Sequence, residues 1–122
     1  MTLPQIHGLL GITVSLYALS VTLWLLWKYL RDQSLDGSFW GVIWTGEGLI
    51  VIQALLGITQ LIMGRMPLEW VHLLYGFLTP MIWPATVNFT RNQPERRKVI
   101  IWIVVCAFLF GVTLRARFTA LP

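Results

Sequence analysis

The sequence predicts an all-α integral membrane protein, folded as an up-down-up-down four-helix bundle. Three observations predict this class: 57% of the 122 residues are hydrophobic, only 11% are charged, and the charges gather at the ends of four long apolar runs. A soluble domain has about 25% charged residues. We therefore expect a single transmembrane domain, 1–122, with spans at about 3–30, 38–64, 68–90 and 98–118.

Turn-forming and charged residues mark where these runs end. Lys28 and Arg31 end the first run, and a polar turn containing Asp36 follows. Gly64 is expected to end the second helix and Pro67 to open the third, because glycine is favoured just after a helix and proline at its start.

Basic residues are distributed unequally between the two ends of the predicted bundle. The first turn and the charged loop 91–98 together hold six: Lys28, Arg31, Arg91, Arg96, Arg97 and Lys98. The opposite end holds three: Arg65, Arg115 and Arg117. Because basic residues favour the cytoplasmic side, the sequence predicts a cell inner (plasma) membrane protein with both termini outside. These helix ends account for the net charge of +4, so no nucleic-acid partner is predicted.

The two histidines, His7 and His72, each lie a few residues into a span that begins on the outer side. The first and third spans run in the same direction and can lie diagonally across a four-helix bundle, which would bring both imidazoles to its centre. Ionisable residues inside a membrane are costly to bury and are usually functional. The alternatives are a hydrogen-bonded structural pair and two side chains near the interface.

A glycine follows each histidine four residues later, Gly11 or Gly76, on the same helix face. Gly57 and Gly111 are expected at a similar level in the second and fourth spans. We interpret the four glycines as a slot without side chains, against which a flat ring could lie. Close packing of membrane helices is the alternative explanation. Residues 6–13 and 52–59 match at six of eight positions, which suggests a duplicated helix pair.

Two imidazoles suit haem iron better than zinc, which takes three or four protein ligands. A haem macrocycle supplies four nitrogens and leaves two axial positions. The single cysteine, within an apolar run, excludes covalent attachment through a Cys-x-x-Cys-His motif. The sequence therefore predicts one non-covalent bis-histidine haem b, with His7 and His72 as the metal ligands. Three outer arginines would contact its propionates, or else only anchor the helices: Arg65, Arg115 and Arg117.

The segment Gln53-Ala54-Leu55-Leu56-Gly57, followed by Gly64, Pro67 and Val71-His72-Leu73-Leu74, resembles the haem A synthase family. Helix pairs of that family have Gln-x-x-Leu-Gly, then Gly, Pro and His-Leu-Leu. The resemblance implies a haem-binding bundle like one half of such a protein, with His72 as an axial ligand and His7 matching the other by position. The family's second bundle and its glutamate-histidine-x-histidine-arginine signature are absent, so hydroxylation of a haem methyl is not implied. A broader likeness is to transmembrane b-type cytochromes.

The sequence thus predicts a small membrane cytochrome that transfers single electrons or carries haem, and that is not an enzyme on its own. Within the lipid bilayer, its partner would be a quinone or a redox protein, and it could form a homo-oligomer or join a larger complex. The alternative is a haem-free membrane subunit with a structural role. Glu47, deep in the second span, is expected to be protonated and hydrogen-bonded. The candidate donors at its depth are Ser20, Thr22 and the indole N–H groups of Trp83 and Trp102. Glu47 would serve either the structure or proton or quinone chemistry.

Overall fold

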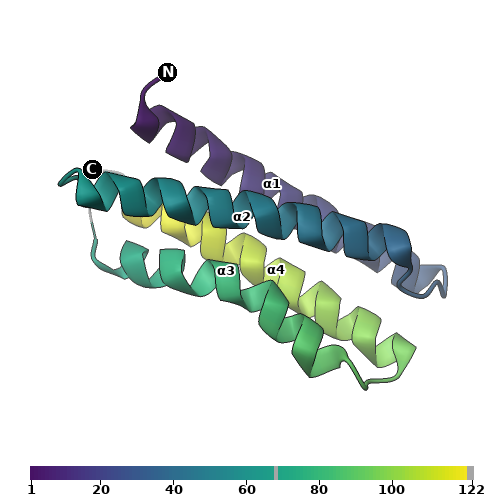
Figure 1. The fold of residues 1–122 in the computed structure, drawn as a ribbon. Coiled ribbons are helices and arrows are strands. Elements are labelled where there is room, and N and C mark those ends of the chain that lie inside the picture. The colour runs from purple at the N-terminus through teal and green to yellow at the C-terminus, as the bar shows by residue number, and fades with distance from the viewer. Residues whose placement is uncertain (68, 121–122) are drawn as a thin grey trace.

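The computed structural model describes residues 1–67 and 69–120 of the chain. These residues form four α-helices (Figure 1): α1 (Leu3–Leu30), α2 (Gly37–Ile62), α3 (Val71–Thr90) and α4 (Glu95–Ala120). The protein is therefore all-α with four helices, as the sequence predicts.

Three of the four helices are long and apolar enough to cross a membrane: α1, α2 and Glu95–Thr119 of α4. Helix α3, which has 20 residues and two internal prolines, is not among them. Many large apolar side chains, such as Leu16, Leu23 and Val104, are exposed on the bundle surface. A surface of this kind is expected where lipid rather than water surrounds the helices.

Short-range hydrogen bonds fix the helix ends. Thr2 and Gln5 form a reciprocal capping box at the start of α1, and Asp36 accepts backbone N–H bonds from Ser38 and Phe39 at the start of α2. Gly64 has φ 83°, the left-handed conformation that glycine adopts without a steric penalty, and it follows the end of α2 as the sequence predicts.

Two predicted boundaries are wrong. Pro67 does not open the third helix, because α3 begins only at Val71; the predicted first residue of that span, Leu68, lies outside the described residues. The charged stretch 91–98 is only partly a loop, because α4 begins at Glu95. An acidic residue in the first turn complements the helix dipole, which favours this earlier start.

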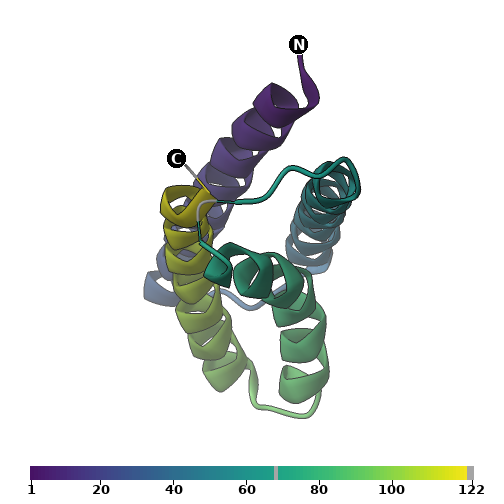
Figure 2. The same cartoon turned by 90° about the vertical axis from the view of Figure 1, so that its left-hand side faces the viewer.

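The helices pack around a square, with α1 diagonal to α3. Helix α1 contacts α2 and α4, and α3 contacts the same two helices. Figures 1 and 2 show the α1–α2 and α3–α4 connections toward one end of the molecule, and both termini with the α2–α3 connection toward the other. Both views also show α3 bending along its length, as expected for a helix that contains Pro80 and Pro84.

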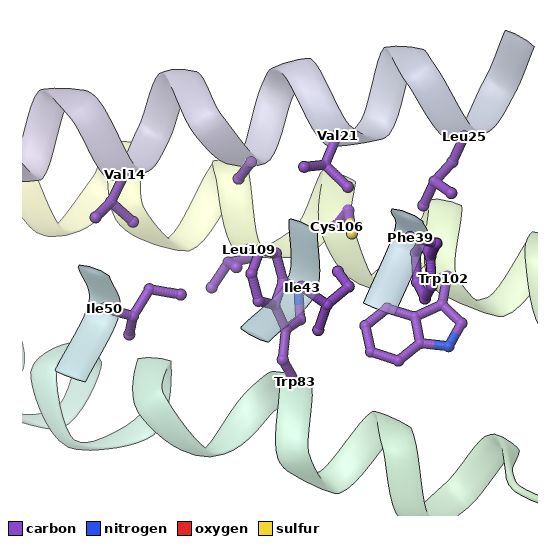
Figure 3. Close-up of a cluster of buried hydrophobic side chains, with 11 residues drawn as sticks. Val14, Val21, Leu25, Phe39, Ile43, Ile50, Trp83, Trp102, Cys106 and Leu109 are labelled. Atoms are coloured by element: carbon purple, nitrogen blue, oxygen red, sulfur yellow. The ribbon is translucent and has the colours of Figure 1, made fainter. Parts of the chain in front are cut away.

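The buried core lies in the middle of the bundle and toward its α1–α2 connection (Figure 3). Aromatic rings dominate the part of the core nearest this connection. The ring centroid of Phe39 lies 4.9 Å from that of Trp40 and 5.2 Å from that of Trp102. The Trp102 indole N–H donates to the Thr90 hydroxyl, which leaves neither group unsatisfied. We call this part of the bundle, with Trp24, the aromatic end.

One ion pair and one hydrogen bond connect the α1–α2 turn to the first turn of α4. Arg96 contacts Asp32 at 2.7 Å, and the Glu95 carboxylate accepts the Leu35 backbone N–H. A further pair, Lys28 with Asp36 at 3.8 Å, lies within the α1–α2 connection. An exposed pair such as Arg96–Asp32 contributes only about 0–1 kcal/mol.

The opposite part of the bundle has almost no core. We call it the histidine end; it comprises residues 3–13 of α1, 51–62 of α2 and 71–78 of α3. Within these described segments every residue is at least partly exposed, whereas each helix contributes buried side chains farther along. On α4 at this end, Thr119 beside His72 is buried. Large apolar side chains are therefore fully buried in the rest of the bundle but not around the two histidines.

Candidate functional site

His7 and His72 lie together, although they come from helices that do not pack against each other. Their ring centroids are 6.3 Å apart and the ring planes are inclined by 79°. The diagonal placement of α1 and α3 expected from the sequence thus brings the only two imidazoles of the chain to one place.

Hydrogen bonding determines which nitrogen of His72 carries the proton. Its Nδ1 lies 2.7 Å from the Ala116 carbonyl oxygen and 3.3 Å from the Thr119 hydroxyl, both on α4. A carbonyl only accepts, so Nδ1 must carry a hydrogen and donate it. In the neutral ring, Nε2 then holds a free lone pair. An imidazole held by Nδ1–H in this way is the usual arrangement for a metal-ligating histidine.

His7 is positioned by close packing rather than by a side-chain hydrogen bond. A Cβ added to Gly57 of α2 would lie 3.2 Å from its Cε1, so this ring occupies the space that the glycine leaves. The Nδ1 of His7 is buried and has no hydrogen-bond partner among the described residues. A buried nitrogen without a partner is costly, so its surroundings are incomplete in the protein alone.

Gln53 is a site residue that the sequence interpretation did not select. Its Nε2 donates to the His7 carbonyl oxygen at 2.8 Å, and it passes close to Gly11, where an added Cβ would lie 3.1 Å from this nitrogen. The repeated segments 6–13 and 52–59 therefore interlock reciprocally. His7 packs on Gly57 of the second repeat, and Gln53 packs on Gly11 of the first. Aligning the repeats places Gln53 at the position of His7, which is the signal that could have identified it.

The other predicted glycines and the arginines are exposed. An added Cβ at Gly76 or Gly111 would meet nothing within 4 Å. Of the four glycines, only Gly11 and Gly57 thus lie close to another side chain. Three arginines at the ends of this region are also exposed and form no ion pair within the described part of the chain: Arg65, Arg115 and Arg117.

The donor set is too small for a metal ion held by protein side chains alone. Among residues 1–67 and 69–120, no three His, Cys, Asp or Glu residues lie together in a metal-binding arrangement. Cys106 is buried in the core, far along α4 from His72's contact with Ala116. Any metal at the two histidines would need its remaining ligands from another source.

The hydrogen bond predicted for Glu47 is not found. Its residue is buried, yet Oε1 has no partner within the described chain. The four candidate donors do not reach it: Ser20 and Thr22 donate to carbonyls of their own helix, Trp102 donates to Thr90, and the Trp83 indole nitrogen has no partner. Hydroxyls in a membrane helix readily bond the carbonyl four residues earlier, which explains why two of these donors are occupied.

Comparisons of this chain with protein-family models, curated proteins and solved structures found no match. The resemblance to haem A synthases therefore rests on the sequence motifs alone.

Proposed function

We propose that the protein is an integral-membrane cytochrome of the b type, an up-down-up-down bundle in which His7 and His72 are the two axial ligands of one non-covalent haem. The observation that carries this proposal is the 6.3 Å separation of the imidazoles. Metal–imidazole bonds are about 2.0 Å and a ring centre lies about 1 Å behind its nitrogen, so opposite ligands of one metal have centroids about 6 Å apart.

The surroundings of the two rings support a bound haem. The hydrogen bond from His72 Nδ1 to Ala116 leaves Nε2 available as a ligand. His7 Nδ1 is an orphaned buried atom, and the histidine end lacks the apolar core that the rest of the bundle has. A large planar apolar group would complete that core. The exposed Arg65, Arg115 and Arg117 at this end offer cations for two propionates.

Two histidine ligands determine the chemistry that haem would supply here. With both axial positions filled, no open site remains for a substrate, so the group would exchange single electrons rather than activate a ligand. We infer one-electron transfer to a membrane quinone or redox protein, or haem carriage, on the outer side of a cell membrane. With α3 as the fourth span and both termini outside, the excess of basic residues at the aromatic end would lie inside.

The reduced-minus-oxidised absorption spectrum of the purified protein tests the proposal. We expect a Soret band with separate α and β bands, and loss of this spectrum in both His7→Ala and His72→Ala. Gln60→Ala is the matched control, because Gln60 is a half-buried polar residue of α2 at the same end. It should keep the spectrum.

A colourless protein, or a spectrum unchanged in both histidine variants, would refute the ligand assignment. A colourless protein that copurifies with a stoichiometric membrane partner would instead favour the haem-free subunit. That partner would then cover the histidine end, which lacks a buried apolar core.

A further inference from the structure

A cavity of about 250 Å³ that is open to the surface lies among α2, α3 and α4 at the aromatic end. Its lining is formed by Trp40, Val87, Thr90, Arg91 and Lys98. Trp40 precedes Gly57 on α2 by 17 residues. At 1.5 Å per residue this places the cavity about 25 Å along the helix from the histidines, too far to exchange electrons by contact.

The lining combines an apolar wall with cations. The Trp40 ring stands edge-on to Phe39 and Trp102, which fixes its orientation. The Thr90 hydroxyl is already engaged, because it donates to the Thr86 carbonyl and accepts from Trp102. The remaining polar groups of the lining are therefore the charged ends of Arg91 and Lys98, of which Lys98 also contacts the Glu95 carboxylate at 3.6 Å.

The positive charge around the cavity favours binding of an anion. At this end, ion pairs with acidic residues neutralise the charges of Lys28, Arg96 and Lys98. Within the described chain, Arg31, Arg91 and Arg97 have no acidic partner. Arg31 is stacked over the Trp27 ring, whereas Arg91 lines the cavity. An anion bound there would gain a charge-assisted hydrogen bond without displacing an existing ion pair of Arg91.

We propose that this cavity binds the phosphate and glycerol of an anionic phospholipid. Arg91 and Lys98 contact the phosphate, while Trp40 and Val87 pack against the glycerol and the first methylenes. We choose an amphiphilic occupant because the cavity has both cationic side chains and an apolar wall. The cavity also lies at a helix end, and helix ends lie where lipid phosphates meet the hydrocarbon of a bilayer. A volume of 250 Å³ accommodates such a polar group and leaves the acyl chains along the exposed helix faces. The proposal does not depend on haem binding.

Native mass spectrometry of the detergent-solubilised protein, titrated with phosphatidylglycerol, tests it. Arg91→Gln with Lys98→Gln should weaken binding of the first lipid about tenfold or more. The matched control, Arg31→Gln with Arg97→Gln, removes two charges from the same end outside the cavity and should change binding less than about twofold. Val87→Phe fills the cavity without changing charge and should also weaken binding, which keeps the test decisive if the double charge variant does not fold.

Three results would overturn the proposal. Equal weakening by both charge pairs would mean that only the overall field attracts lipid. Equal affinity for phosphatidylcholine would mean that the anion is not recognised. Displacement of the lipid by inorganic phosphate at the same concentration would assign the cavity to free phosphate instead.

Discussion

The aromatic end and the histidine end of the bundle are built in opposite ways. At the aromatic end, Phe39 and Trp102 are fully buried, neighbouring ring centroids lie within 6.4 Å of one another, and the Arg96–Asp32 ion pair joins the loops. At the histidine end, no residue of segments 3–13, 51–62 and 71–78 is buried, and two imidazoles and an amide occupy the interior.

This difference teaches that apolar and aromatic packing stabilises one end of the bundle far more than the other. Interior packing in proteins is normally dense, and in a membrane packing replaces the hydrophobic effect as the main force between helices. The sparse packing around the two histidines is consistent with the bound group proposed above. The predictions below test the two ends in turn.

The largest effect should come from removing a packed ring at the aromatic end. Trp102→Ala creates a cavity beside Phe39 and leaves the Thr90 hydroxyl without its donor, so we expect a loss of about 3 kcal/mol in unfolding free energy. Leu9→Ala at the histidine end removes a side chain that is 49% exposed, and should cost under about 0.5 kcal/mol. Denaturant titration in mild detergent would measure both. Similar losses would contradict the contrast between the ends.

An intermediate effect is expected at the histidine end, on the haem rather than on the fold. Gly57→Ala places a methyl group 3.2 Å from His7 Cε1, so the ring must shift by a few tenths of an ångström. Altering a residue that supports a metal ligand weakens binding by about tenfold or more, and we expect that loss in haem titration followed at the Soret band.

Gly8→Ala is the control for that substitution. It lies next to His7 on α1, and an added Cβ there would meet nothing within 4 Å. Haem affinity should stay unchanged while helix stability rises slightly. If Gly8→Ala weakens haem binding as much as Gly57→Ala does, the contact between Gly57 and His7 is not what positions the ligand.

The smallest effect concerns the loops beyond the aromatic end. Hydrogen bonds from the Ser38 hydroxyl and from the Phe39 N–H hold the pKa of Asp36 below its ordinary value of 3.8. The unfolded chain therefore binds this proton more readily, so the contribution of Asp36 to stability is complete above pH 3.8 and disappears as the pH falls through the lower folded pKa.

Asp36→Asn separates this titration from the cap itself, since asparagine also caps helices but does not titrate. The wild-type melting temperature should fall slightly more than that of the variant when the pH is lowered below 3.8. Parallel falls would mean that other carboxylates dominate the acid response.

Most of the fold follows from local sequence signals. Apolar runs, a polar turn containing Asp36, and Gly64 as a stop place four helices within a few residues of their observed bounds. The error at Pro67 arose because proline is compatible with both a helix start and an extended connection. Glu47 was misjudged for a different reason: whether a donor reaches a buried carboxyl depends on side-chain positions that helix register alone does not give.

The sequence by itself determined the all-α class, the apolar helices, the segregation of basic residues and the two histidines at equivalent ends of like-oriented helices. Only the tertiary structure decided which groups meet: the 6.3 Å approach of the imidazoles, the Nδ1 bond of His72 to Ala116, and the reciprocal packing of His7 on Gly57 and Gln53 on Gly11. The physical reason is the separation along the chain over which each kind of interaction acts. Hydropathy, caps and turns act between residues close in the chain, whereas these contacts join residues 42 to 65 positions apart, whose meeting depends on how all four helices pack together.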